Sequence, residues 1–478
     1  MSNDVAPTEL GAGCRCVACW MLTYYILMRR GGLLLTVTTA LLAGCTTRST
    51  MESALNQAGS NRTELEAVLN HYRDTDINPQ KLRAAEFLIE NMPAHYSYAD
   101  ERIYEYYDYA GRILADKSLT PEQQHDSLLA ITRQKYRDLS SHTIPDAQVI
   151  KADFLIDNID KSYAQWTTCP WTGHLTFDEY LEWILPYKFA ELQAQDHWRD
   201  TLYARFCAPC LEERTLYKND AEYYNVVEVA DGVREYTGKH IHRHIVDDAT
   251  VLPLLSDHLL ASMTYGTASD YSLMLALLMR SLGVPAALDE TPVGPRGNAS
   301  TQWLVILSDR GDQLTTEWDF KTKIGEGFFP YERGPKVYRN TYSINREREE
   351  YLRKAKYKYP FEVNRRDVTR QYFLTSNLSL PVDNAVKKHL KDKYVYIASA
   401  VRKDGNPWQI VDFGKIKGGK ACFNDMGREV LYTIMGYDGT GLIEITDPFI
   451  LHKDGSVEYI SADTISSASL DKWKNCAL

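Results

Sequence analysis

Apolar residues recur three and four positions apart over the first third of the chain, which is the spacing of an α-helix with one buried face. Pro79 and Pro121 stand where a helix can begin, and Pro93 and Pro145 interrupt the pattern. The pattern predicts a helical region with segments at 79–91, 100–116, 121–139 and 147–166. A further helical stretch, rich in aromatic residues, is expected at 175–199.

The last third of the chain has a different pattern. From about Arg365 onward, short runs alternate apolar and polar residues, and Gly and Asp residues separate them. Such runs predict strands, and their spacing predicts a β-sandwich. The runs lie at 394–401, 409–413, 430–437 and 441–445. The charged stretch at 346–358 is interpreted as a helical or loose linker before this domain.

Between these regions, residues 265–285 predict one strongly apolar helix, which we expect to be buried. Ser269 or Asp270 is expected to cap its start. Gly283 and Pro285 are expected to end it, because Gly tolerates the left-handed conformation that follows a helix and Pro cannot continue one.

A buried strand at 301–307 and a returning strand at 313–319 follow this helix. We expect Arg310-Gly311 to form a two-residue turn, which fixes the register of the hairpin. That register pairs Gln302 with Asp319 and Trp303 with Trp318.

The helix and hairpin resemble those of the transglutaminase-like superfamily, whose core has a papain-like fold. In that family a Gly-x-Cys-x-Asp start leads into a helix that ends in Arg-x-Leu-Gly-Ile/Val-Pro. The matching positions are Gly266, Asp270, Arg280, Leu282, Gly283, Val284 and Pro285. The resemblance implies that Ala268 occupies the position of the catalytic cysteine. It also implies that Gln302 replaces the histidine and that Asp319 matches the orienting acid.

Two of these three residues cannot perform the family's chemistry. A thiol at the start of a buried helix loses its proton readily, whereas Ala268 has nothing to ionise. Gln302 can form hydrogen bonds but cannot transfer a proton at neutral pH. We therefore predict a degenerate core that binds peptide or glycan material without catalysis, with no cofactor and no metal. Its cleft is expected to be lined by Tyr265, Asp270, Tyr271, Trp303 and Trp318.

Two other functions stay open at this point. The first is a hydrolase acting on peptide or amide bonds through a hydroxyl such as Thr267 or Ser269, which would need a general base within reach. The second is a structural protein of an envelope assembly, which predicts a large exposed apolar patch.

The amino-terminal region carries a targeting pattern. Arg29 and Arg30 precede a short apolar run that is too short to span a bilayer. The run closes on Leu-Ala-Gly-Cys at 42–45, which resembles the lipobox of bacterial lipoproteins. The resemblance implies a lipid anchor on Cys45 and an outer-membrane location. Residues 1–44 are interpreted as a signal peptide behind a start assigned too early.

Charge and cysteine content narrow the classes of function. The chain has 478 residues and a net charge of −10, which argues against nucleic acid as a partner, because phosphate binding needs a basic face. Cys207 and Cys210 form a C-x-x-C pair, interpreted as a local disulfide or two unreactive thiols. Alternating histidines at 240, 242 and 244 fit either a zinc site or a solvated edge.

Together these patterns predict an α+β multidomain protein. Its parts are a helical N-terminal region at 45–165, a core of a helix and an antiparallel sheet at 166–345, a linker at 346–364 and a β-sandwich at 365–478. The resemblance implies that the core is papain-like and transglutaminase-like.

Overall fold

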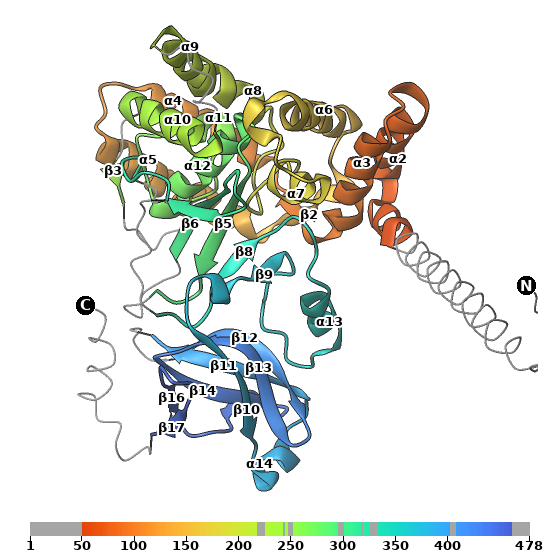
Figure 1. Ribbon diagram of the computed structural model, residues 1–478, viewed down its shortest axis with the longest axis vertical. Coiled ribbons are helices and arrows are strands. Elements are labelled where there is room, and N and C mark those ends of the chain that lie inside the picture. Colours follow the sequence, from red (N-terminus) through yellow and green to blue (C-terminus); the bar gives the residue numbers. More distant parts are fainter. Residues whose placement is uncertain are drawn as a thin grey trace, which may run out of the picture.

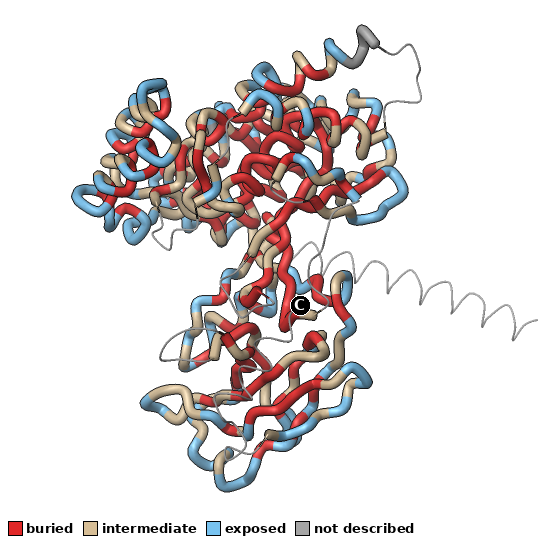
Figure 2. The backbone as a smooth tube through the Cα atoms, turned by 90° about the vertical axis from the view of Figure 1, so that its left-hand side faces the viewer, coloured by how far each residue is buried: buried red, intermediate tan, exposed pale blue. Residues whose placement is uncertain are grey.

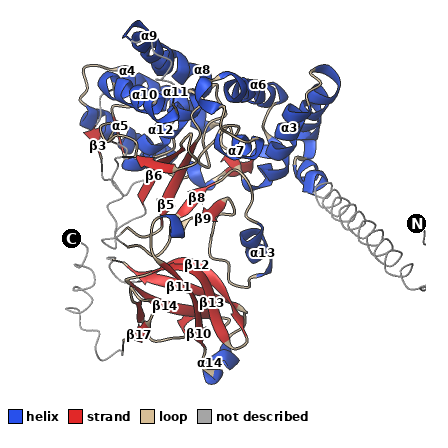
Figure 3. Ribbon diagram, viewed as in Figure 1, coloured by secondary structure: helices blue, strands red, loops and turns tan. Residues whose placement is uncertain are grey.

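The structure is a computed structural model that describes residues 50–217, 225–241, 244–246, 252–294, 301–316, 319–325, 333–401 and 408–460. It is a mixed helix and sheet protein, with the helices gathered around a small sheet and a larger curled sheet beyond them (Figures 1 and 3). Cys45 lies outside the described residues. Within them, no helix is long and apolar enough to cross a membrane.

The N-terminal region forms helices close to the predicted segments. Asn78 and Thr120 cap two of them, with a proline in the first turn of each, as the sequence pattern predicts. The helices are α2 (Arg62–Asn70), α3 (Pro79–Asn91), α4 (Arg102–Ala115), α5 (Pro121–Ile131) and α6 (Ala152–Thr168). The short strands β1 (Tyr96–Tyr98) and β2 (Thr143–Pro145) pair between them.

The middle of the chain adds shorter helices. The aromatic stretch at 175–199 forms α7 (Phe177–Trp183) and then runs without regular structure to α8 (Trp198–Leu202). These are followed by α9 (Ala208–Tyr217), α10 (Val226–His240) and α11 (Asp257–Leu260), and by the short parallel pair β3 (His244–Ile245) and β4 (Tyr265–Gly266).

Helix α12 (Ala268–Ser281) is the central helix of this region, and every residue from Tyr271 to Ser281 is buried. It packs on a five-stranded antiparallel sheet with the order β7-β6-β5-β8-β9. The strands are β5 (Ala286–Thr291), β6 (Thr301–Leu307), β7 (Gln313–Thr316), β8 (Tyr338–Asn340) and β9 (Arg365–Asp367). Leu304 and Ile306 of β6 share a hydrophobic cluster with α12, whereas Trp303 and Val305 belong to a cluster on the other face.

The register of the β6–β7 hairpin differs by one residue from the prediction. Leu307 pairs with Gln313 and Leu304 with Thr316. The turn has three residues rather than two, because Gly311 adopts a φ of 80° and its N–H donates to the carbonyl of Ser308. This is the turn that places a left-handed residue before the returning strand. Ser308 rather than Asp309 is therefore the residue that bonds to Asp312 across the hairpin.

The C-terminal region is one curled sheet rather than the predicted sandwich of two sheets. Its order is β10-β13-β12-β11-β14-β16-β17, with β15 also paired to β14. The strands are β10 (Thr375–Pro381), β11 (Tyr394–Ala400), β12 (Trp408–Lys417), β13 (Lys420–Gly427), β14 (Val430–Tyr437), β15 (Leu442–Glu444), β16 (Phe449–Leu451) and β17 (Val457–Tyr459). A curled sheet buries its concave face and so shows the same alternation as a sandwich, which is why the pattern did not separate them.

The predicted linker packs against this sheet. It contains α13 (Arg346–Lys354), and the Tyr351 ring stacks on Phe413 at 4.3 Å while Phe361 lies 5.4 Å from the same ring. Through these aromatic contacts the segment packs against one face of the C-terminal sheet. Figure 2 shows buried residues continuing through the narrow waist between this sheet and the helical part. A last helix, α14 (Asn384–His389), lies at the far end.

Hydrophobic packing crosses the boundary predicted near residue 165. Tyr106 of α4 and Leu128 of α5 share one cluster with Leu275 of α12. The helical region therefore forms one wall of the core around α12.

Two buried arginines hold the end of α12. Arg280 is 3% exposed and donates to the carbonyl oxygens of Glu182, Trp183, Pro186, Lys188 and Ala286. Its guanidinium carbon lies 3.6 Å from the centre of the Phe189 ring. Arg199 donates to the carbonyl oxygen of Arg280 and to those of residues 184–186. Burial lowers the pKa of Arg280 well below its usual value, so the carbonyl oxygens supply its solvation.

We expect Arg280→Met to destabilise the protein by about 3 kcal/mol or more, because buried carbonyl groups lose their donors while the apolar volume is kept. Urea unfolding at pH 7 measures this. The control is Arg310→Met, since Arg310 is exposed in the β6–β7 turn. Equal free energies of unfolding for the two variants would show that the carbonyl contacts of Arg280 are not needed.

Candidate functional site

The start of α12 is fixed by a reciprocal capping arrangement. Thr267 Oγ1 accepts the N–H of Asp270 at 3.2 Å, and Asp270 Oδ2 accepts the N–H and the hydroxyl of Thr267, each at 2.8 Å. The helix is therefore capped by Thr267, one turn earlier than expected for Asp270 and two residues before Ser269. The prediction missed this because Ser, Thr and Asp are all good caps and three of them stand within the four residues 267–270.

Gly266 allows the chain to enter this turn. A methyl group on its Cα would lie 2.5 Å from Met263 Cε and 3.3 Å from the ring of Tyr271. A side chain at residue 266 would therefore require the end of Met263 to move.

The three residues that the resemblance matches to a catalytic triad lie on α12, on β6 and in the turn after β7. Ala268 is its first residue, on the same face as Ser272 one turn later, whose hydroxyl donates to the carbonyl of Gln302 at 3.1 Å. Gln302 shares the face of β6 that carries Leu304 and Ile306, so its side chain faces α12.

Asp319 stabilises the turn that follows β7. Its Oδ1 accepts the N–H groups of Lys321 and Thr322, each at 2.9 Å. Burial alone would raise the pKa of Asp319, but these hydrogen bonds and the charge of Arg234 outweigh it and lower the pKa. The carboxylate of Asp319 therefore forms its hydrogen bonds within its own loop.

The predicted cleft residues fall into separate places. Tyr265 and Asp270 line a cavity beside the start of α12. Tyr271 is fully buried, with its ring 6.2 Å from that of Phe320. Trp303 lies on the sheet face away from α12, where its indole N–H donates to the hydroxyl of Tyr372. Trp318 lies outside the described residues.

The cavity has a volume of about 390 Å³ and lies beside the start of α12. One wall is the turn into α12, formed by Gly266, Thr267, Ser269 and Asp270. Tyr106 of α4, His125 of α5, the segment 252–255 and the pair Glu191 and Leu192 also line it. Ser269 is exposed, so the cavity opens to solvent beside the helix start.

Three tyrosines, Tyr98, Tyr106 and Tyr265, line this cavity. Tyr98 accepts the N–H of Leu254 at 2.8 Å, whereas the buried hydroxyl of Tyr265 has no hydrogen-bond partner among the described residues. Burial raises the pKa of Tyr265, and the nearby Tyr106 and Asp270 raise it further. Burial also raises the pKa of Asp270, although its bonds from Thr267 oppose this.

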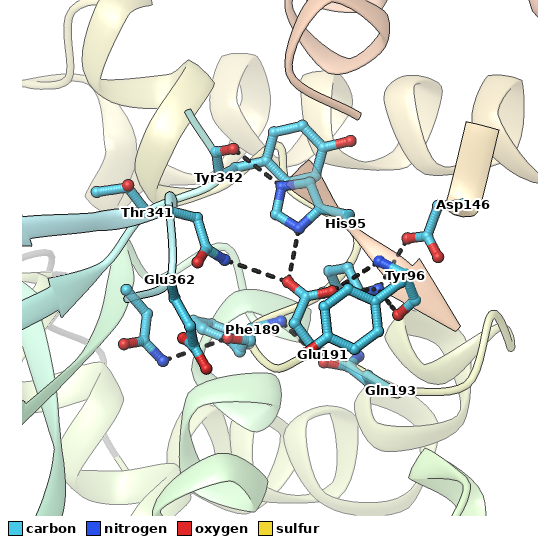
Figure 4. Close-up of polar contacts among 12 residues, drawn as sticks. His95, Tyr96, Asp146, Phe189, Glu191, Gln193, Thr341, Tyr342 and Glu362 are labelled. Carbon is cyan, nitrogen blue, oxygen red and sulfur yellow. Dashed lines mark hydrogen bonds and ion pairs between the residues drawn. The ribbon is translucent and has the colours of Figure 1, made fainter. Parts of the chain in front are cut away.

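A buried ionic network includes Glu191, which lines the cavity (Figure 4). Glu191 accepts from His95 Nδ1 at 2.8 Å and from the N–H of Tyr96 at 2.8 Å, and it lies 3.4 Å from Lys188 Nζ. Lys188 also pairs with Asp146 at 2.8 Å. His95 Nε2 lies 2.9 Å from the carbonyl oxygen of Tyr342, which follows β8. The network thus ties the N-terminal helices to the sheet.

Metal and thiol candidates show no reactive arrangement among the described residues. Cys169, Cys207, Cys210 and Cys422 are free thiols, and burial raises the pKa of Cys169 to about 11 and that of Cys207 to about 12. Of the alternating histidines, His240 contacts the carbonyl of Tyr236 and His244 pairs with Glu122, while residue 242 lies outside the described residues. Two acidic clusters with His71 and His197 each already hold a lysine, Lys81 or Lys161.

Comparisons with protein-family models, with curated proteins and with solved structures found no match to this chain.

Several residues of the cavity were not identified from the sequence. Tyr98, Tyr106, His125 and Glu191 come from segments that the pattern described only as a helical scaffold. The one signal was the density of tyrosine in α4, but helical spacing alone does not say which tyrosines face a cavity.

We expect the charge of Glu191 to stabilise the protein above about pH 4.5 and this contribution to be lost as the pH falls toward 2. Burial alone would raise the pKa of Glu191, but the charges of Lys188 and His95 outweigh it and lower the pKa from 4.5 to about 2. A lowered pKa means that the folded state favours the ionised form, so protonation removes stability.

Glu191→Gln should therefore be less stable than the wild type at pH 7 and should lose less stability between pH 5 and pH 3. Urea unfolding across this range measures it, with the exposed Glu101→Gln as the control. Parallel pH profiles for Glu191→Gln and the wild type would contradict the role given to this carboxylate.

Proposed function

We propose that this chain is a non-catalytic binding protein with a degenerate transglutaminase-like core, anchored in the bacterial outer membrane through lipid on Cys45. It holds peptide or glycan material in the cavity beside the start of α12. The observation that carries the proposal is a cavity of about 390 Å³ with tyrosine-rich walls at the N-terminus of a buried helix. Concave sites with mostly apolar walls and a few fixed polar groups are typical of small-ligand binding.

The order of elements supports the transglutaminase-like core. Helix α12 leads directly into β5, and β5, β6 and β7 lie side by side in the sheet. Ala268 and Gln302 lie at the helix start and on the facing strand, as the resemblance implies. Both lack the groups needed for acyl transfer.

The alternative hydroxyl nucleophiles are poorly placed for catalysis. Thr267 Oγ1 already accepts one hydrogen bond and donates another within the capping arrangement. Ser269 is exposed and has no base within hydrogen-bond distance among the described residues. A hydroxyl without a base is a weak nucleophile, so the geometry favours binding over hydrolysis.

The alternative of a structural assembly protein predicts a contiguous apolar surface. The large apolar side chains exposed in the described chain belong instead to separate segments. They are Ile77, Tyr104, Tyr203, Ile245, Leu374 and Tyr459.

The test is calorimetric titration of the full chain with a panel of short peptides and oligosaccharides. We expect at least one member to bind, and Ser269→Trp to weaken it by at least about tenfold, because the indole fills the mouth of the cavity. Ser269→Ala is the matched control and should bind like the wild type.

Mass spectrometry of the same mixtures should show no product. Failure of every panel member to bind, or equal binding to Ser269→Trp, would contradict the proposal. Turnover of a peptide or amide that is lost in Asp319→Ala would contradict its non-catalytic part.

A further inference from the structure

Nine lysines gather at one end of the C-terminal sheet, although the chain as a whole has a net charge of −10. They come from three segments, at 354–356, 387–393 and 415–420. Eight are exposed and Lys415 is partly buried. The set, which we call the basic end, is Lys354, Lys356, Lys387, Lys388, Lys391, Lys393, Lys415, Lys417 and Lys420.

Contacts between the segments show that these lysines share one surface. The N–H of Ile416 donates to the carbonyl of Lys393 at 2.8 Å. Two of the lysines approach the same aromatic ring, because Lys393 Nζ lies 5.7 Å and Lys415 Nζ 5.4 Å from the centre of the Tyr394 ring. The segments 387–393 and 415–420 therefore lie side by side.

The other lysines belong to the same surface. The N–H of Lys356 donates to Asp392 Oδ2 at 2.6 Å. A methyl group on Gly419, in the turn between β12 and β13, would lie 4.0 Å from Lys387 Nζ. α14, which carries Lys387, lies at the end of the molecule away from α2 (Figure 1). The basic end is therefore one surface at an end of the molecule.

Carboxylates neutralise little of this surface. Among the described residues, Glu350 alone pairs with its lysines, and it lies 2.7 Å from Lys354 Nζ and 3.7 Å from Lys415 Nζ. The carboxylates of Asp383 and Asp392 accept backbone N–H groups. The other seven lysines form no ion pair within the described part of the chain.

Lysines elsewhere in the described chain are mostly paired. Lys135, Lys161, Lys188 and Lys239, for example, each form an ion pair with a carboxylate. Like charges that lie together without partners repel one another, and an anionic partner removes this repulsion. The basic end therefore has the charge of a surface that binds an anionic partner.

The residue types favour one kind of anionic partner. The cations here are lysines, with Arg353 beside them as the one arginine, and lysine is a compact charge without the fork that recognises single phosphates in a fixed geometry. The rings of Tyr357 and Tyr437 pack on each other, with centres 5.7 Å apart, and no large apolar side chain at this end is exposed. Stacking on the bases of a nucleic acid needs such exposed rings.

The charge of the remaining chain also favours a flat partner. Because the basic end is positive, the rest of the molecule is more negative than the net charge of −10. A long flexible polyanion that extends beyond the basic end is therefore repelled. A bilayer can meet one end of a molecule alone, and at physiological salt charges more than about 8 Å away from it are largely screened.

We propose that the basic end docks on bilayers that contain anionic phospholipids, with the lysine ammonium groups against the headgroup phosphates. This inference is independent of the cavity beside α12 and of the lipid proposed on Cys45. Each lysine near such a surface strengthens binding by about fivefold. Several lysines together therefore bind a bilayer without inserting an apolar side chain.

The test is sedimentation of the full chain with vesicles of phosphatidylcholine alone or with about one third phosphatidylglycerol. We expect the anionic vesicles to bind at least about tenfold more tightly in about 0.1 M salt, and this difference to disappear in about 1 M salt. Equal binding to both kinds of vesicle would overturn the proposal, as would a preference for the anionic vesicles that persists in high salt.

Two pairs of substitutions locate the docking surface. Lys387→Gln with Lys388→Gln in α14, and Lys417→Gln with Lys420→Gln at the β12–β13 turn, should each weaken binding to the anionic vesicles by about tenfold. Both pairs keep residues 1–49, so any contribution of that segment is unchanged. An effect of the first pair without any effect of the second would overturn the single surface.

The matched control is Lys117→Gln with Lys321→Gln, which removes the same charge from exposed lysines outside the basic end. This pair should bind the anionic vesicles like the wild type. Equal weakening by the control would show that net charge decides binding, and would overturn the proposal.

A single-stranded oligonucleotide is the competing polyanion. We expect it to leave vesicle binding unchanged when its phosphate concentration equals that of the anionic lipid. An oligonucleotide that displaces the vesicles and loses its own binding with Lys387→Gln and Lys388→Gln would overturn the assignment to a bilayer.

Discussion

The guanidinium group of Arg280 holds the C-terminal end of α12 by donating to carbonyl oxygens from the segment 182–188 and from β5. No carboxylate neutralises it there at hydrogen-bond distance among the described contacts, so main-chain dipoles supply its solvation. Arg199 adds a second guanidinium to the same group of carbonyls. Because a buried arginine loses these acceptors only at high cost, the position of α12 against the sheet is strongly determined.

Fixing one end of α12 determines what surrounds the other. Its first turns lie between β6, where the carbonyl of Gln302 accepts the Ser272 hydroxyl, and the cavity walls contributed by α4 and α5. On the sheet side, the residue types cannot transfer protons or attack a substrate. On the side of α4 and α5, a cavity with tyrosine hydroxyls and the Asp270 carboxylate remains. The proposed account is that the helix start keeps the geometry of a catalytic site and uses its opposite face for binding.

Local sequence signals predicted much of the fold. Prolines in the first turn located α3 and α5, and the run from 430 to 437 coincides with β14. Signals failed where the outcome depends on contacts distant in sequence. The alternation in the C-terminal region does not distinguish a sandwich from one curled sheet, and the β6–β7 register depended on the conformation of Gly311. The network of His95, Lys188 and Glu191 joins segments nearly a hundred residues apart, so no local pattern predicts it.

The residues that line the cavity also divide into those that the sequence predicted and those that it did not. Asp270 and Tyr265 were expected to line a site because they stand beside the helix start, and they do line the cavity. Tyr98, Tyr106 and His125 come from other helices and loops, and their convergence depends on the packing of α4 and α5 against α12. The side chain of Trp303 points away from α12, because side chains alternate along β6 and those of the even-numbered residues face the helix.

The most direct measurement of the central claim is the pH dependence of thiol alkylation at residue 268, followed by peptide mapping. It compares Ala268→Cys alone with the pair Ala268→Cys and Gln302→His, and uses Ser269→Cys with Gln302→His as the control on the other face. The account predicts that only the first pair lowers the pKa of the new thiol, because the imidazole then faces it across the helix start. An unchanged thiol pKa in that pair would show that Ala268 and Gln302 do not keep the geometry of a catalytic site.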